Sequence, residues 1–107
     1  MRKFETVKAH NEFNTIIKNG HYQKNKYFIL YNIPNKLNYP RFGLAISTKY
    51  GHAFERNKIK RQVRNIVTNN KKLFSNNQDY IIMIRKACIN LNYQELDIEL
   101  INLIQGA

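Results

Sequence analysis

The spacing of hydrophobic residues predicts three amphipathic helices, each marked by apolar residues at intervals of three and four that share one helix face. The first stripe ends at Gly20, a natural helix terminator. The second begins near Ala53 or Phe54, and the third follows a capping pair, Asn92 and Glu95. The stripes consist of Ala9, Phe13, Ile16 and Ile17; of Ile59, Val63, Ile66 and Val67; and of Leu96, Leu100, Leu103 and Ile104.

Three segments between these helices have the composition of β-strands. Residues 27–33 are rich in aromatic and β-branched side chains. Residues 41–47 alternate between two faces, so we expect a hairpin with the first strand across the loop at 34–40. Residues 79–84 form an unbroken apolar run, typical of a strand covered on both faces. An extra short strand around Lys49 also fits, and the whole order predicts one sheet with helices packed on it.

Six aromatic residues crowd the first half of the chain beside several lysines and an arginine. Alternation places Tyr27 and Tyr31 on one face of the first strand and Phe28 on the other. Rings on the less covered face could stack on unpaired bases. The alternative is that they are core residues, which we favour for Phe28 and Phe42. The six are Tyr22, Tyr27, Phe28, Tyr31, Tyr39 and Phe42.

Length and charge narrow the class of protein. A chain of 107 residues without linker-like blocks accommodates one domain, spanning 1–107. Eighteen Lys and Arg against seven Asp and Glu give a net charge of +11. So large a surplus favours a polyanionic partner such as nucleic acid, although a basic surface that serves only solubility is the alternative.

Several other classes find no support in the sequence. No apolar stretch approaches the ~20 residues of a membrane span, and the charged start is not followed by an apolar signal segment. We therefore expect a soluble, cytoplasmic protein. The single cysteine, Cys88, cannot form an internal disulfide and is expected to be a small buried side chain, and no Cys/His spacing suits zinc.

A search for catalytic residues finds no convincing set. Two-metal phosphodiester chemistry needs converging carboxylates, and the seven acids are scattered. Glu95 and Glu99 lie one turn apart, but on the expected outer side of the last helix. His10, His21 and His52 have no spacing that pairs them as acid and base, and no phosphate-cradling glycine loop is present. The sequence predicts a binder rather than a self-sufficient catalyst.

The second predicted helix concentrates the positive charge. Ile59 and Val63 mark its inner face, and cations spread around the outer face, with Glu55 as the only acid nearby. A rigid helix with cations a turn apart suits the phosphates of a nucleic-acid backbone, and arginine adds two-point hydrogen bonding. The alternative, an ordinary solvated face, usually mixes both signs. The polar outer residues are Arg56, Asn57, Lys58, Lys60, Arg61 and Arg64.

The segment Arg56-Asn57-Lys58-Ile59-Lys60-Arg61-Gln62-Val63-Arg64 closely resembles the signature of the protein subunit of bacterial ribonuclease P, which is Arg-Asn-Arg followed by Ile-Lys-Arg and another Arg. The resemblance spans nearly the whole chain. It also includes Phe13, Gly20, the segment 28–31, the segment 41–47, Lys49, the segment 79–82 and Arg85.

This resemblance implies a fold and a function. The fold is α+β in the order α-β-β-β-α-β-α, with a left-handed βαβ crossover, although the general rule for such connections is right-handed. The function is to assist a catalytic RNA that removes the 5′ leader from precursor tRNA. The RNA holds the Mg²⁺ ions and cleaves, the protein binds no metal of its own, and one protein pairs with one RNA.

Residue roles follow from the same resemblance. Arg56, Asn57, Lys58, Lys60, Arg61 and Arg64 are expected to contact the catalytic RNA. Phe13, Ile17, Tyr31 and Lys49 are expected at the cleft for the single-stranded leader of precursor tRNA. Two positions depart from the pattern. Lys58 replaces an arginine and loses its planar fork. Ile17 stands where many members have an aromatic ring, so we expect leader stacking either to be weaker or to move to Tyr22 or Tyr27.

Three other classes share some of these features. A ribosomal or other structural RNA-binding protein would have the same charge, basic helix and aromatics. A DNA-binding regulator would lay the basic helix in a major groove, but no second helix lies a few residues upstream to complete a helix-turn-helix. A protein-only nuclease would need the catalytic residues that the sequence lacks.

Overall fold

The computed structural model describes residues 6–7 and 10–106 and has the expected order of elements. Two predicted features, the start of the first helix at Ala9 and the side chain of His10, lie outside the described residues. The helices and strands are α1 (His10–Asn19), β1 (His21–Lys24), β2 (Phe28–Pro34), β3 (Arg41–Ile46), α2 (Ala53–Asn69), β4 (Gln78–Ile84) and α3 (Tyr93–Gln105). Short 3-10 helices join them: η2 (Thr48–Tyr50), η3 (Lys71–Leu73) and η4 (Lys86–Asn90).

The four strands form one mixed sheet in the order β1-β2-β4-β3. The expected hairpin between β2 and β3 is wrong, because β4 lies between them, antiparallel to β2 and parallel to β3. Alternation along a strand shows which face is buried but not which strand is its neighbour. The most apolar strand takes a central place, where both of its edges are hydrogen-bonded and both of its faces are covered.

The additional strand around Lys49 is also wrong. Residues Thr48–Tyr50 form η2, in which the Ser47 hydroxyl accepts a hydrogen bond from the backbone amide of Lys49. The third strand before α2 is instead β1, which pairs antiparallel with β2. Three of the four β1 residues are exposed, so this edge strand lacks the apolar alternation that would have predicted it.

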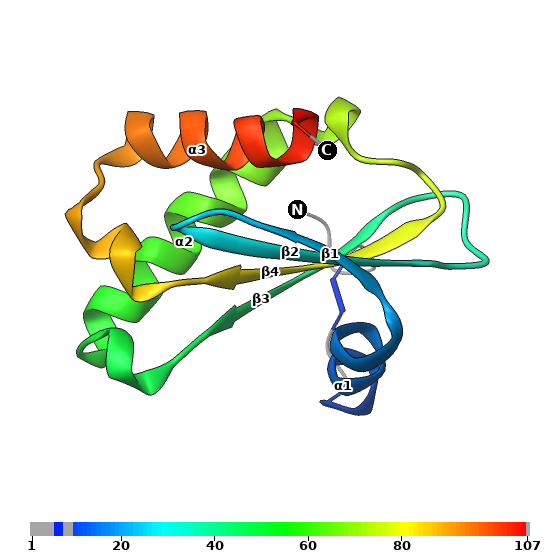
Figure 1. Cartoon of the computed structure of the whole chain (residues 1–107), viewed down its shortest axis with the longest axis horizontal. Helices are drawn as coiled ribbons and strands as arrows, with labels where there is room; N and C mark the ends of the chain where they lie inside the picture. Colours follow the sequence, from blue (N-terminus) through cyan, green and yellow to red (C-terminus); the bar gives the residue numbers. More distant parts are fainter. Residues whose placement is uncertain (1–5, 8–9, 107) are drawn as a thin grey trace.

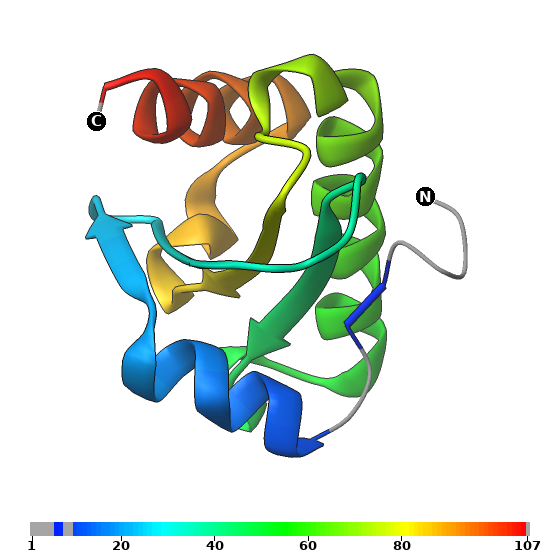
Figure 2. The same cartoon turned by 90° about the vertical axis from the view of Figure 1, so that its right-hand side faces the viewer.

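Helices α2 and α3 lie on one side of the sheet and α1 lies alone on the other (Figure 1). The view in Figure 2 shows α3 across the top, α2 along one side and α1 beneath. The chain leaves β3, passes through α2 and returns as the adjacent parallel strand β4. With α2 on the upper side and β4 on the β2 side of β3, this connection has the left-handed sense expected from the resemblance.

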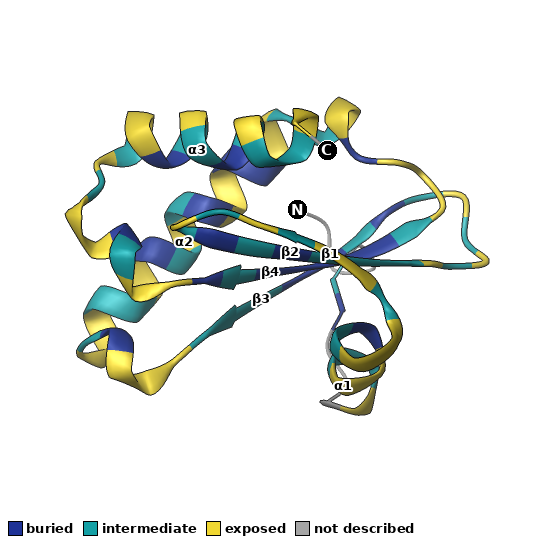
Figure 3. Ribbon diagram, in the orientation of Figure 1, coloured by how far each residue is buried: buried dark blue, intermediate teal, exposed yellow. Residues whose placement is uncertain are grey.

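The two sides of the sheet enclose two separate hydrophobic clusters. The large core lies under α2 and α3 (Figure 3). The predicted stripe of α2 is fully buried in it, whereas in α3 Leu96 and Leu100 are buried and Leu103 and Ile104 are partly buried. Phe28 and Phe42 belong to it, at 0% and 1% exposure. The small core lies under α1 and contains Val7, Ile16 and Ile81 as buried residues. Because side chains of a strand alternate, β4 contributes to both clusters, which explains its unbroken apolar run.

The predicted helix ends agree with the structure. Asn92 caps α3 by accepting a hydrogen bond from the Glu95 amide, and the Glu95 carboxylate accepts one from the Asn92 amide. At α2, the Glu55 carboxylate accepts the His52 amide in the same way. Gly20 follows α1 where a Cβ would stand 2.6 Å from the Asn32 carbonyl oxygen, so only glycine fits so close to β2.

Candidate nucleic-acid interface

Helix α2 presents the basic signature residues on its outer surface. Asn57, Lys58, Arg61 and Arg64 are exposed, whereas Lys60 is half-buried. The opposite stripe of the helix, from Ile59 to Val67, is buried in the large core and fixes which face is turned outward. Glu55 is the only acid in the helix, and capping occupies its carboxylate. The helix therefore offers a nearly unopposed positive surface.

Arg56 differs from the other signature residues because it also has a structural contact. Its guanidinium Nη1 donates a hydrogen bond of 2.6 Å to the Gly51 carbonyl oxygen, and the side chain is half-buried. This contact ties the loop before α2 to the first turn of the helix. The other guanidinium N–H groups have no partner among the described residues, so Arg56 can both position the loop and bind an anion.

Lys60 and Arg64 connect the helix to the α1 side of the molecule. Both line a small cavity of about 150 Å³ together with Phe13 of α1 and residues of β3. Two groups to which the resemblance assigns different roles, the signature cations and the α1 aromatic, therefore meet at the edge of β3. The arrangement gives a continuous path from the basic helix to the second surface.

That second surface is the part of the sheet next to α1. Phe13, Ile17 and Tyr31 all pack against the small core, and each remains half-buried. Phe13 lies directly over Gly43 of β3, where a Cβ would come within 2.5 Å of the ring atom Cζ. The structure thus brings together three of the four residues predicted for the leader cleft. The fourth, Lys49, is exposed in η2 beyond the end of β3, outside this cluster.

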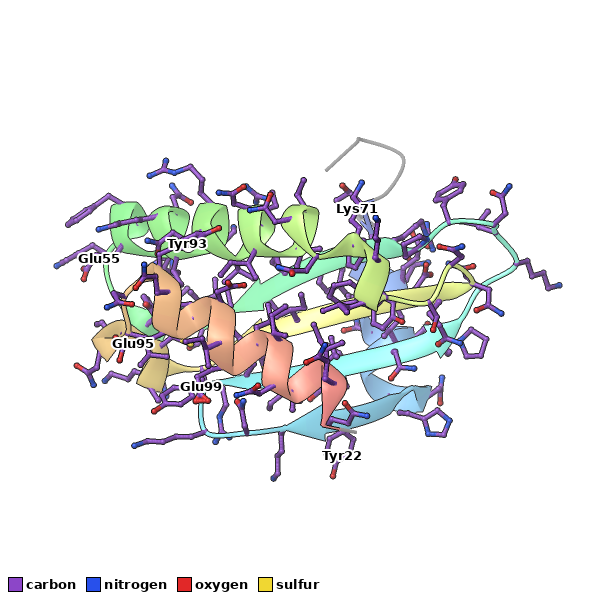
Figure 4. All side chains as sticks on the ribbon, turned by 90° about the horizontal axis from the view of Figure 1, so that it is seen from above. Tyr22, Glu55, Lys71, Tyr93, Glu95 and Glu99 are labelled. Atoms are coloured by element: carbon purple, nitrogen blue, oxygen red, sulfur yellow. The ribbon has the colours of Figure 1, made fainter. Side chains whose placement is uncertain are left out.

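Of the two tyrosines considered as replacements for an aromatic at position 17, only Tyr22 joins this surface. Tyr22 pairs with Tyr31 in the β1–β2 register, their ring centroids are 5.9 Å apart, and Tyr22 is 60% exposed. Tyr27 packs against the large core, with the Lys26 ammonium 5.9 Å from its ring centroid. Tyr22 projects from the edge strand that sequence periodicity missed (Figure 4).

An ion-pair network that sequence analysis missed fastens α1 to the sheet. Arg41 of β3 donates to both carboxylate oxygens of Asp79, at 2.9 Å from Nε and 2.6 Å from Nη2. The same Nη2 contacts Glu12 of α1 at 2.7 Å. Asp79 is only 5% exposed, and Asn35 donates a further hydrogen bond to it at 2.8 Å. The hydrogen bonds to Asp79 and Glu12 and the charges of these carboxylates raise the pKa of Arg41, so the guanidinium stays charged.

The described residues form no cluster of metal ligands, and their single thiol is buried. No group of three or more His, Cys, Asp or Glu side chains there could hold a metal ion. Cys88 is 1% exposed, as expected of a small buried side chain, and burial raises the pKa of its thiol to about 12. Its Sγ donates to the Tyr27 carbonyl oxygen at 3.2 Å. Within the described residues, no helix is long and apolar enough to cross a membrane.

Known proteins resemble the chain over almost its full length. The family model for ribonuclease P matches residues 1–107. The ribonuclease P protein component of Streptococcus pneumoniae is 34% identical over 105 residues, which cover 98% of this chain and 85% of that protein.

Solved structures agree with the sequence match. A mutant of the Staphylococcus aureus RNase P protein, described as defective in mRNA degradation, has a TM-score of 0.90 at 30% identity, covering 96% of this chain and 87% of that one. The RNase P protein of Thermotoga maritima has a TM-score of 0.87 at 29% identity, covering 96% and 97%.

Proposed function

Since the chain belongs to the family of ribonuclease P protein components, we propose that it binds the catalytic RNA of ribonuclease P and the 5′ leader of precursor tRNA. In this complex it assists the endonucleolytic removal of the leader that produces the mature 5′ end of tRNA. The RNA carries the Mg²⁺ ions and the hydrolysis, and the protein supplies binding.

The observation that carries this proposal is the junction between the basic helix and the α1-side surface. Lys60 and Arg64 of α2 share a cavity with Phe13, so that phosphate-binding groups adjoin a half-buried aromatic surface. Arginine and lysine side chains bind phosphates of either RNA. Rings and flat apolar side chains hold unpaired bases by stacking, which suits a single-stranded leader. One small domain can thus contact two RNA molecules at once.

We assign the contacts with the catalytic RNA to the signature residues of α2. Asn57, Lys58, Arg61 and Arg64 are exposed along one helix, and Arg56 and Lys60 flank them. The lysine at position 58 keeps the charge of the signature arginine but binds phosphate as a point charge.

The leader lies across the α1-side surface, and Tyr22 takes part. Phe13, Ile17 and Tyr31 form the apolar floor against the small core, and the exposed ring of Tyr22 extends this floor toward the edge of the sheet. Lys49 lies at the end of β3, where it can neutralise leader phosphates that leave the surface rather than contact the stacked bases.

A reconstitution experiment tests the proposal directly. A 5′-labelled precursor tRNA is incubated at low Mg²⁺ with catalytic RNA alone, with the protein alone, and with both. Cleavage at the mature 5′ end only when both are present supports the accessory role. Lack of stimulation together with tight binding to ribosomal RNA would instead identify a structural RNA-binding protein. Cleavage by the protein alone would show that its own side chains are catalytic.

A further inference from the structure

A second recess lies on the far side of α2, away from α1, and Lys58 is its only lining residue with a role in the function proposed above. It is a cavity of about 440 Å³ between the first half of α2, η4 and the start of α3. This volume lies in the range of small-ligand pockets, ~300–1,000 Å³. Glu55 and Tyr93, both of which line it, lie at the same end of the molecule where α2 begins beside α3 (Figure 4).

Two large apolar side chains stand exposed on the walls of the recess, among polar lining residues. Phe54 is 72% exposed and Ile89 is 46% exposed, although they come from different elements and face one cavity. His52 stacks on Phe54, with an interplanar angle of 8° and a centroid separation of 6.0 Å, so the Phe54 ring is supported on one side. The floor consists of buried Ile59, Cys88 and Tyr50. A flat ligand could therefore stack on the Phe54 ring and contact the buried floor residues beneath it.

The recess also contains polar groups without partners. Tyr50 is 6% exposed, and its hydroxyl has no hydrogen bond within the described part of the chain. The side-chain amide of Gln62 likewise has no hydrogen-bond partner among the residues that the structure describes. By contrast, the Asn92 side chain and the Glu55 carboxylate are occupied by helix capping. A hydroxyl and an amide, each a donor and an acceptor, match the mixed edge of a nucleobase.

Positive charge adjoins the recess on the α2 side and continues into the signature surface. Lys58 lies on its rim. Gln62 and Tyr93 also line an adjoining groove that contains Arg61 and Arg64. A base inserted beside Phe54 would therefore have its flanking phosphates near three cations of α2. The adjoining cations favour RNA over an apolar peptide, since an apolar peptide brings no anion to them.

We propose that this recess between α2, η4 and α3 holds one unpaired nucleobase of the catalytic RNA, stacked on Phe54 and hydrogen-bonded by Tyr50 and Gln62. The proposal rests on the proposed function, because the RNA that supplies the base is the one that the signature helix binds. It adds a base-specific anchor to an interface otherwise made of phosphate contacts.

The test measures binding of full-length ribonuclease P RNA to the intact protein. Phe54→Ala should weaken binding roughly five- to hundredfold, the range expected for loss of one stacked base. Tyr50→Phe should weaken it by a smaller factor. Ile98→Ala, which removes a similarly exposed apolar side chain from the outer face of α3, should leave the affinity unchanged.

A fluorescent variant gives an independent readout. The chain contains no tryptophan, so Phe54→Trp introduces a single reporter. Its emission should be quenched by the catalytic RNA, which has unpaired bases, and not by a fully paired RNA duplex at the same phosphate concentration. Wild-type affinity of Phe54→Ala, or unchanged emission of Phe54→Trp at saturating catalytic RNA, would overturn the proposal.

The experiment separates this inference from the proposed function. If the wild-type protein binds the catalytic RNA and stimulates cleavage while Phe54→Ala behaves identically, only the base pocket is refuted. If the wild-type protein neither binds that RNA nor stimulates cleavage, both proposals fail together. A peptide-binding recess would leave RNA affinity and Phe54→Trp emission unchanged, which also counts against the base pocket.

Discussion

The two faces of the sheet use the same strands but are covered to different extents. The face under α2 and α3 carries the large core, in which Phe28, Val63 and Ile82 are completely buried. The face under α1 carries the small core, where most apolar residues stay half-buried and Tyr22 is largely exposed. One face therefore provides most of the apolar burial that stabilises the fold. The other keeps rings accessible to a ligand, and α1 must be held there by something besides apolar contact.

The Arg41 network is that additional attachment, and removing it should have the largest effect on stability. Arg41→Met leaves Asp79 buried without its cation, which costs about 3–5 kcal/mol of unfolding free energy. Glu12→Gln removes only the half-exposed partner of the same guanidinium and should cost about 0–1 kcal/mol. Urea unfolding of the two variants measures the difference. Similar small losses in both would mean that Asp79 does not depend on Arg41.

The close contact between α1 and β3 can be tested by comparing two glycine substitutions, one within this contact and one outside it. Gly43→Ala places a Cβ 2.5 Å from Phe13 Cζ and 2.8 Å from Ile81 Cδ1, so we expect a loss of about 1–3 kcal/mol from overpacking. Gly51→Ala is the matched control, because its Cβ would meet only the end of the Glu55 side chain, at 3.0 Å, and no ring or backbone atom. It should stay within about 0.5 kcal/mol of wild type. Thermal unfolding distinguishes the two, and equal stability would show that Phe13 can move aside freely.

The face under α2 and α3 should also show the smaller, pH-dependent effect of a buried thiol, Cys88. Burial raises the pKa of Cys88 from 9.0 to about 12, so the folded protein holds a proton that the unfolded chain releases. Stability from this group is complete below pH 9 and is lost as the pH rises from 9 to 12. Wild type should therefore lose stability relative to Cys88→Ala across that interval. A constant difference between the two proteins would contradict the burial of the thiol.

Sequence patterns located the helices, the buried faces and the basic helix, because each depends on local periodicity. The alternation of Phe42, Leu44 and Ile46 correctly identified the residues of β3 that pack on the large core. It could not give the neighbour of β3, since the pairing with β4 is fixed by a crossover through a whole helix. Strand β1 was missed because an exposed edge strand carries no apolar alternation.

In the candidate site, too, sequence patterns predicted the features that depend on local spacing and missed those that depend on contacts distant in the chain. The outward face of α2 followed from its spacing, and so did the burial of Ile59 and Val63. The Arg41 network joins residues 29 and 38 positions apart, and no local pattern records such a contact. The role of Tyr22 depended on the β1–β2 register, which only the three-dimensional structure supplies.

The most direct test of the central claim, that the face under α1 binds the leader, compares two substrates. Affinities of the reconstituted holoenzyme for precursor tRNA and for mature tRNA are measured with Phe13→Ala and Tyr31→Ala, alongside Ile98→Ala as a control on the opposite side. We expect each of the first two to weaken precursor binding roughly five- to hundredfold while leaving mature tRNA nearly unaffected. Equal losses for both substrates would remove the α1-side face from the leader path.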